Sequence, residues 1–147
     1  MAELRRRACA VIACYARPEA LDLLEEASGC RVAPDEALVV VDEDAAGPAR
    51  ARIHRTLAGV DPDALVLDAT DGWTAWSLEG ADARVAFERL SDLPLPTSGA
   101  VAGAVLGIPA RVLVTAGSIL VLVTSAEAAW WERTARRRVP ELEEELR

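Results

Sequence analysis

The sequence contains no lysine, asparagine or glutamine, and all 16 of its basic residues are arginine. A chain without lysine cannot form an internal aldimine with a carbonyl compound, and it cannot place a lysine on a nucleotide phosphate. Both kinds of chemistry are therefore excluded. Acidic residues outnumber basic ones, and the formal net charge of −8 argues against nucleic acid and anionic membranes as partners.

Cysteine and histidine are also scarce. The three cysteines are Cys9, Cys14 and Cys30, no C-x-x-C motif occurs, and the single histidine, His54, is distant from them in the sequence. This spacing does not match that of metal ligands, so we expect no metal site. Reduced, buried cysteines in a cytoplasmic protein are the expectation that follows.

Two apolar segments raise the question of a membrane. Arg5 to Arg7, followed by the apolar Ala8 to Ala16, resembles the start of a signal peptide, but the apolar run is short and an arginine follows at once. Val101 to Val123 is apolar enough to suggest a membrane span, yet Pro109 and Arg111 interrupt it. We therefore expect no membrane helix, and short buried strands in the second segment.

The length of 147 residues and the apolar content of 52 % predict a single folded domain, residues 1–147. The periodicity predicts an α+β fold in which helices pack on a mainly antiparallel sheet. From Ala64 the expected order of elements is β-β-α-β-β-β-α, and an N-terminal β-α-β-α extension precedes it. Residues 1–29 supply the first strand and helix of that extension, and residues 139–147 form a charged C-terminal tail.

Turn residues and apolar periodicity give more detailed expectations. Asp71-Gly72 predicts a tight turn between two antiparallel neighbours, and Ala116-Gly117 predicts the turn of a hairpin. The residues that we expect in the core are Leu38, Val40, Ile53, Leu57, Leu65, Leu67, Trp76, Leu78, Phe87, Leu90, Val112, Val114, Leu120 and Leu122.

The glycines at 99, 103 and 107 have a regular spacing of four. This is not the G-x-G-x-x-G pattern of a dinucleotide site, and a proline and an arginine follow where a helix should begin. We interpret these glycines as small residues that allow another backbone to approach closely.

Four tryptophans, against one phenylalanine and one tyrosine, are an unusual balance. Trp73 and Trp76 are three residues apart in an expected strand, so they should point to opposite faces. Trp130 and Trp131 are adjacent in an expected helix, about 100° apart, and Trp131 should be the one in the core. The outer indoles either cover the rim of the sheet or belong to a partner surface. The residues of that possible surface are Trp73, Trp130, Arg133 and Arg137.

Enzyme chemistry has two candidate groups in this sequence. The carboxylates of Asp61, Asp63, Asp68 and Asp71 could form an acid–base pair, but they occupy turns and strand ends, where aspartate makes local hydrogen bonds. A Ser-His-Asp system would have to use His54 as its base. His54 follows the apolar position 53 of its helix, so it should face solvent and not serve in such a system. We therefore expect no catalytic residues and no independent enzymatic activity.

Several short motifs resemble a known family. The patterns D-x-x-D-G at residues 68–72 and L-x-G-x-D-A-R at residues 78–84 resemble the folate-binding fold of the glycine cleavage T protein, an aminomethyltransferase. P-D-E at residues 34–36 and L-P-L at residues 93–95 resemble segments of the gamma subunit of heterotetrameric sarcosine oxidase, a small relative in that superfamily. The sarcosine oxidase gamma-like region spans residues 30–138.

The resemblance implies a non-catalytic accessory subunit or interaction module in sarcosine and one-carbon metabolism, located in the cytoplasm. Its partners would be larger oxidase subunits or a second copy of itself. In such oxidases the flavins, the nicotinamide cofactor and folate belong to the larger chains, so we expect no cofactor on this chain alone; folate is possible, but no motif supports it. The alternative is a stand-alone module that binds folate or another pterin beside Trp73 or Trp76.

Overall fold

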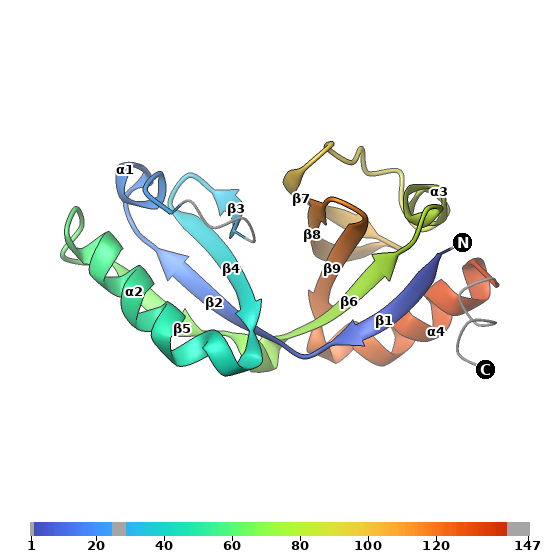
Figure 1. Ribbon diagram of the computed structural model, residues 1–147, viewed down its shortest axis with the longest axis horizontal. Coiled ribbons are helices and arrows are strands. Elements are labelled where there is room, and N and C mark those ends of the chain that lie inside the picture. The colour runs from blue at the N-terminus through green and yellow to red at the C-terminus, as the bar shows by residue number, and fades with distance from the viewer. Residues whose placement is uncertain (1, 25–28, 141–147) are drawn as a thin grey trace. The chain divides into compact units, whose positions relative to one another are not determined.

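The computed structural model describes residues 2–24 and 29–140, which form two compact units. Residues 8–70 form the inserted unit, and residues 1–7 together with 71–147 form the host unit. Each unit has its own sheet, and all the strand pairings are antiparallel. The predicted α+β class with antiparallel pairing is confirmed, but there are two sheets where the sequence predicted one (Figure 1).

The inserted unit contains a four-stranded sheet in the order β3-β4-β2-β5. Its strands and helices are β2 (Cys9–Tyr15), α1 (Pro18–Leu21), β3 (Gly29–Ala33), β4 (Glu36–Asp42), α2 (Ala46–Ala58) and β5 (Leu65–Asp68). Helix α2 lies along one face of this sheet (Figure 1). Ala49, Ile53 and Leu57 recur every four residues, so they form one apolar stripe, which packs with Ile12 and Val39 of the sheet.

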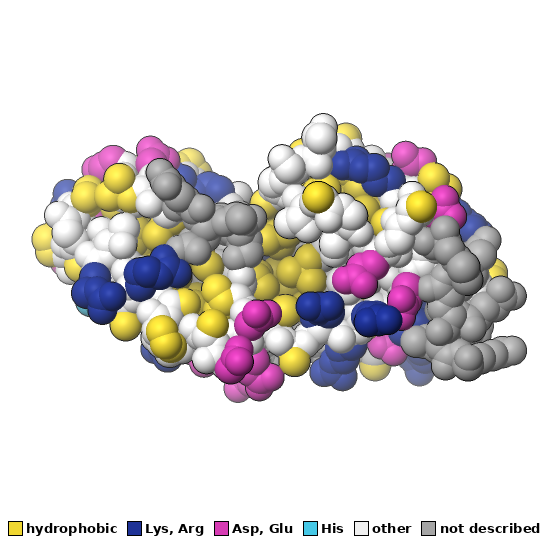
Figure 2. All heavy atoms as spheres, viewed as in Figure 1, with side chains coloured by type: hydrophobic (Ala, Val, Ile, Leu, Met, Phe, Trp, Pro, Cys, Tyr) yellow, Lys and Arg dark blue, Asp and Glu magenta, His cyan; other side chains and the backbone are white. Residues whose placement is uncertain are grey.

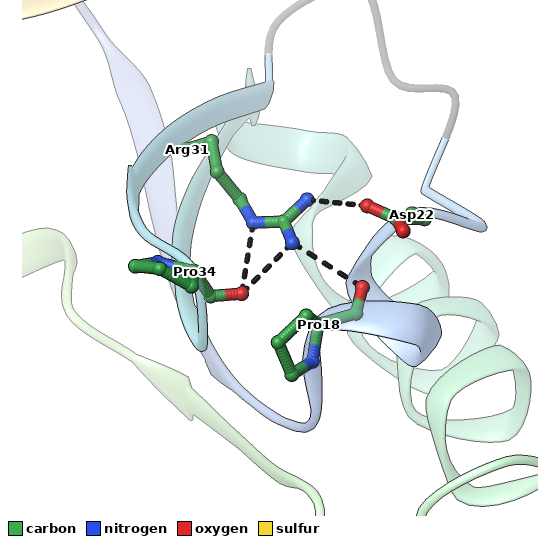
Figure 3. Close-up of polar contacts among 4 residues, drawn as sticks. All are labelled: Pro18, Asp22, Arg31 and Pro34. Carbon is green, nitrogen blue, oxygen red and sulfur yellow. Dashed lines mark hydrogen bonds and ion pairs between the residues drawn. The ribbon is translucent and has the colours of Figure 1, made fainter.

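Arg31 joins β3 to α1 within the inserted unit (Figure 3). Its Nη1 donates to Asp22 Oδ1 at 3.0 Å, and its Nη2 donates to the carbonyl oxygens of Pro18 at 3.2 Å and Pro34 at 2.8 Å. The carbonyl oxygen of Pro18 also accepts from the backbone N–H of Asp22 at 2.9 Å, the bond that closes the single turn of α1. The guanidinium group adds a second bond to that oxygen, so a single side chain fixes this short helix against the sheet.

The host unit contains a five-stranded sheet in the order β1-β6-β9-β8-β7. Its strands and helices are β1 (Glu3–Arg7), β6 (Trp73–Glu79), α3 (Ala83–Glu88), β7 (Gly99–Val105), β8 (Ile108–Thr115), β9 (Ser118–Thr124) and α4 (Ala128–Arg138). Phe87 of α3 and Trp131 of α4 pack against Trp76, Val112 and Val121 of the sheet to form its core. Because side chains alternate along a strand, Trp73 and Arg111 lie on the opposite face.

The structure corrects several expectations. Asp71-Gly72 belongs to a 3₁₀ turn, Thr70–Gly72, that connects strands of two different sheets, so it does not join antiparallel neighbours. Strand β1 lies in the arginine-rich segment that resembled the start of a signal peptide. Leu65 and Leu67 of β5 are 55 % and 49 % exposed, although they were expected in the core. Leu120 is half-buried.

Other expectations hold. Thr115 pairs with Ser118, so Ala116-Gly117 forms the predicted hairpin turn. The remaining core residues are buried as expected, and these are Leu38, Val40, Ile53, Leu57, Trp76, Leu78, Phe87, Leu90, Val112, Val114 and Leu122. Among residues 2–24 and 29–140, every helix is too short or too polar to cross a bilayer. The predicted C-terminal tail lies largely outside the described residues, which end at Pro140.

Candidate functional site

The two tryptophans of α4 differ completely in exposure. Trp131 is fully buried, and its ring lies 4.9 Å from that of Trp76, centroid to centroid, at an angle of 33°. Trp76 in turn donates from Nε1 to Glu132 Oε2 at 3.1 Å. Trp130 is 44 % exposed. The predicted division into a core indole and an outer indole is therefore confirmed, and it leaves a large aromatic side chain on the surface.

Trp130 forms part of the wall of a groove with a volume of about 590 Å³, which we call the Trp130 groove. Three segments of the host unit contribute to it: one side of α4 from Trp130 to Arg138, the end of α3 with the loop that follows, and the end of β7 with the β7–β8 turn. Its lining residues include Arg89, Ser91, Ala104, Leu106, Trp130 and Arg138.

Hydrogen bonds hold the loop of the Trp130 groove against the β7–β8 turn. Ser91 Oγ donates to the carbonyl oxygen of Ala104 at 2.7 Å and accepts from the backbone N–H of Leu93 at 3.0 Å. The backbone N–H of Leu106 donates to the carbonyl oxygen of Leu90 at 2.9 Å. Two segments that are distant in sequence are thus joined by backbone contacts, which gives the groove a defined shape.

Leu106 adopts an unusual backbone conformation at the edge of this groove. Its φ is 55° and that of Gly107 is 76°, so both central residues of the two-residue turn are left-handed. Asparagine, aspartate or glycine is the usual choice at the first position, and leucine there costs about 1–2 kcal/mol. Such strain is concentrated at functional sites. The left-handed Leu106 was not predicted from the sequence, where its only signal is Leu-Gly between two apolar runs.

The charges around the Trp130 groove have both signs. Arg89 and Arg138 line it, as do Glu88 and Asp92, and Arg89 Nη2 donates to the carbonyl oxygen of Arg138 at 3.1 Å. On the face drawn in Figure 2, arginine and acidic side chains likewise lie in small groups with apolar side chains between them. Of these residue types, tryptophan and arginine are enriched at protein interfaces, whereas acidic residues are depleted there.

The structure does not bring all four predicted surface residues together. Arg133 and Arg137 are exposed on α4 but do not line the Trp130 groove, whose arginines are Arg89 and Arg138. Trp73 lies on β6, on the other face of the sheet from α4. Of the residues that line the Trp130 groove, Trp130 was therefore predicted from the sequence, and those from the other two segments were not.

Trp73 belongs to a second arrangement, the Trp73–Arg111 pair. The guanidinium carbon of Arg111 lies 5.6 Å from the centre of the Trp73 ring, within the range of a cation–π contact. Nη1 of Arg111 donates to the carbonyl oxygen of Ala110 at 3.3 Å, whereas its Nε is buried without a hydrogen-bond partner. Within the described part of the chain, no carboxylate pairs with this side chain.

A second unsatisfied group lies on the same face of the host sheet. Ser77 Oγ is buried and has no hydrogen-bond partner, and Ser77 is two residues from Ala75, which shares a cross-strand row with Leu122 and Arg111. Buried polar groups normally have partners, because leaving them unpaired is costly. Arg111 Nε and Ser77 Oγ are therefore two unsatisfied polar groups on one face of the host sheet.

Asp61 and Asp68 accept hydrogen bonds from backbone N–H groups. Hydrogen bonds from the backbone N–H groups of Arg17 and Asp63, both 2.9 Å long, lower the pKa of Asp61 although its burial acts in the opposite direction. Hydrogen bonds from the side chain and backbone of Thr70 lower the pKa of Asp68. An acid–base pair needs one carboxyl whose pKa is raised. These two carboxylates are instead held ionised, which is typical of turn residues.

His54 is exposed, as its place on α2 predicted. It lines a shallow hollow of about 360 Å³ together with Gly47, Arg50, Ala51 and Val66, none of which is an acid or a nucleophile. Among residues 2–24 and 29–140, no cluster of three histidine, cysteine or acidic residues could hold a metal ion. The hollow therefore has no complete catalytic constellation.

No protein-family model and no curated protein matches this chain, whereas solved structures do. The heterotetrameric sarcosine oxidase of Corynebacterium sp. U-96, in complex with pyrrole 2-carboxylate, is similar with a TM-score of 0.73 and 17 % identity. The glycine cleavage system aminomethyltransferase T of Bartonella henselae is similar with a TM-score of 0.66 and 13 % identity. The chain has the aminomethyltransferase T-like fold.

The two matches differ in how much of each relative they cover. The sarcosine oxidase match includes 96 % of this chain and 85 % of that chain, so the two are of nearly equal extent. The aminomethyltransferase match includes 92 % of this chain but only 45 % of that chain. At these identities the aminomethyltransferase T-like fold is shared, and residue roles are not transferred from it.

Proposed function

We propose that this chain is a non-catalytic accessory subunit or interaction module of the kind represented by the gamma subunit of heterotetrameric sarcosine oxidase. The observation that carries the proposal is the similarity to a chain of a heterotetrameric oxidase over almost the whole length of both. A match to less than half of an aminomethyltransferase would by itself suit a fragment of an enzyme. The protein then acts in the cytoplasm, in sarcosine or related one-carbon metabolism.

The Trp130 groove is the surface that we assign to the larger partner subunit. Tryptophan and arginine are both among the residues enriched in interface hot spots. The groove combines this indole with the apolar side chain of Leu106 and the guanidinium groups of Arg89 and Arg138. A partner would bury the indole that α4 leaves exposed, and the strained Leu106 would pack against it.

Co-expression tests this function directly. If genes for two large oxidase subunits lie beside the gene for this chain, the three products are expressed together and purified through a tag on this one. We expect an equimolar complex that survives size-exclusion chromatography. The variant Trp130→Ala should lose the partners, while Val85→Ala should keep them, because Val85 is 60 % exposed on α3 and does not line the groove. Failure of the wild-type chain to bind these subunits would contradict the proposal.

The Trp73–Arg111 pair favours a second candidate function, the binding of folate or another pterin. A pterin ring stacks well on an indole, and an arginine without a carboxylate partner can bind the carboxylate groups of the folate tail. Titration with tetrahydrofolate should change the tryptophan emission, and Arg111→Gln should weaken the response more than the matched variant Arg133→Gln on α4. No change in emission at millimolar ligand would count against this function.

A further inference from the structure

The two edges of the host sheet differ in charge. Edge strand β1 has the sequence Glu-Leu-Arg-Arg-Arg, whereas β7 at the other edge reads Gly-Ala-Val-Ala-Gly-Ala-Val. No charged residue occurs between Asp92 and Arg111. Proteins usually protect an exposed edge with charges, prolines or a very short strand, because an open edge can pair with another chain. Strand β7 is seven residues long and has neither a charge nor a proline.

The edge strands of the inserted unit are protected in these usual ways. Strand β5 has only four residues and ends in Asp68, and β3 has five residues with Arg31 at its centre. Of the edge strands in the described part of the chain, β7 is thus the longest and the one without a charged residue. The contrast indicates that this edge is suited to pairing.

The register shows which peptide groups of β7 face outward. Val105 pairs with Ile108 across a two-residue turn, and the pair that flanks such a turn exchanges hydrogen bonds. Val105, Val101 and the two glycines of β7 therefore bond to β8, because the bonded pairs recur at every second residue. The residues between them, Ala100, Ala102 and Ala104, direct their N–H and C=O groups away from β8. The carbonyl oxygen of Ala104 accepts the bond from Ser91 Oγ, as this assignment requires.

The side chains leave this edge accessible. Ala102 and Ala104 are exposed, and their methyl groups allow another backbone to approach. The loop that precedes β7 packs on the helix-covered face of the strand: a Cβ added to Gly103 would lie 2.6 Å from Leu93 Cδ1. That loop therefore supports β7 from the helix-covered face and reaches its outer edge at Ala104, through Ser91 Oγ. It makes no backbone–backbone hydrogen bond to Ala100 or Ala102.

We propose that β7 is an interface for a second copy of this chain, in which the two β7 strands pair antiparallel about a two-fold axis at Ala102. Ala102 then lies opposite Ala102 of the second copy, and Ala100 lies opposite Ala104 of the second copy. In this register the outward N–H and C=O groups of Ala100 and Ala102 and the N–H of Ala104 gain partners, and the two five-stranded sheets join. The C=O of Ala104, which already accepts from Ser91 Oγ, accepts a second bond through its other lone pair. The sequence of β7 suits self-pairing, because small uncharged residues face each other without repulsion.

The inference uses the open edge of β7 and does not rest on the accessory-subunit function. Its first test is the association state of the full chain, measured by sedimentation velocity over a range of concentrations. We expect a dimer that Ala102→Pro weakens at least about tenfold, because proline removes an N–H that would donate across the interface. The monomer should stay folded, since that N–H is outside the β7–β8 ladder, and circular dichroism checks this. Ala102→Ser keeps the N–H and should still dimerise.

A charge exchange tests the two-fold register. Ala102→Lys and Ala102→Glu place like charges opposite each other, so each variant alone should dimerise more weakly than the wild type, and an equimolar mixture should regain the association. The double variant Ala100→Lys with Ala104→Glu should dimerise, because this register sets each lysine opposite a glutamate.

Three results would overturn the proposal. The first is a wild-type chain that stays monomeric at every concentration, even if β7 then binds a different subunit. The second is a dimer that Ala102→Pro leaves intact. The third is a mixture of the two charged variants that associates no better than either variant alone.

Discussion

Trp130 and Trp131 are neighbours in sequence but have opposite physical roles. A helix turns about 100° per residue, so two adjacent side chains cannot both point into one core. The small residues Ala128 and Ala135 lie on the same side of α4 as Trp131 and allow it to pack closely on Trp76. Trp130 is consequently left at the surface, where only a partner can bury the rest of its indole.

Replacing these two residues with alanine should have unequal effects on stability. Trp131→Ala removes a fully buried side chain and should lower the free energy of unfolding by about 3 kcal/mol or more. Trp130→Ala should change it by no more than about 1 kcal/mol, because nearly half of that side chain is already in water. Urea unfolding curves of both variants measure this difference. If the two substitutions proved equally damaging, the assignment of faces on α4 would be wrong.

Asp61 should contribute a recognisable acid dependence to stability. Its pKa in the folded chain is below the ordinary value of 3.8, chiefly because the backbone N–H of Arg17 donates to the carboxylate. A lowered pKa stabilises the folded state above about pH 4, and this contribution disappears as the pH falls through the folded pKa. Asp61→Asn should therefore be less stable than the wild type at pH 7, and the difference should shrink towards pH 3. A difference that stays constant across this range would contradict this assignment.

The candidate site could be predicted only in part at the residue scale. Periodicity along one helix was enough to place Trp130 outside, because the relevant geometry is local. The contact between Trp73 and Arg111 could not be predicted, since β9 lies between their two strands in the sheet. Pairing of strands that are distant in sequence depends on the whole fold, and no local pattern specifies it.

For single helices and strands, the type of the element can be predicted from the sequence more reliably than the burial of its side chains. The apolar run from Ala64 to Leu67 does form most of a strand, β5, but Leu65 and Leu67 were expected in the core. The strand lies at the edge of its sheet, where Leu65 and Leu67 remain about half exposed. Strand β1 was not predicted, because its three arginines do not resemble an apolar strand. It is nevertheless an edge strand that pairs with β6, and charged residues are common on such strands.

Gly103 is the position where β7 and its preceding loop meet most tightly. A methyl group at residue 103 would lie 2.6 Å from Leu93 Cδ1 and 3.1 Å from Leu93 Cδ2, so Gly103→Ala must displace that side chain. Such overpacking typically costs about 1–3 kcal/mol, which outweighs the smaller entropic gain of replacing glycine. The control is Gly47→Ala in α2, where no atom lies within 4 Å of the added carbon. Thermal melts should show a loss of stability for the first variant and a gain for the second.

At the scale of the whole molecule, the aromatic residues report on the two units separately. All four tryptophans are in the host unit, and the only tyrosine, Tyr15, is in the inserted unit. The sequence predicts one domain of 147 residues. The unfolding midpoint measured by tryptophan emission should then equal the midpoint measured by far-ultraviolet circular dichroism, which monitors both units.

Two separate unfolding transitions, only one of which changes the tryptophan emission, would instead show that the two units are independently stable domains. Chemical shifts of backbone amides in each unit, followed through the same titration, would identify which one unfolds first. A single set of coincident midpoints is the expected result.

The pairing of β1 with β6 has a consequence for the time course of folding. Arg7 lies opposite Ala75, so the ladder of the host sheet cannot close until residues 8–74 have been brought into a compact loop. Closing a long flexible loop has an entropic cost that grows with its length. The inserted unit reduces that cost once it is folded, because Val11 and Thr70 are then joined: the N–H of Val11 donates to Thr70 Oγ1 at 3.0 Å. A substitution that slows folding of the inserted unit should therefore delay the β1–β6 pairing, although the substituted residue is not part of the host sheet.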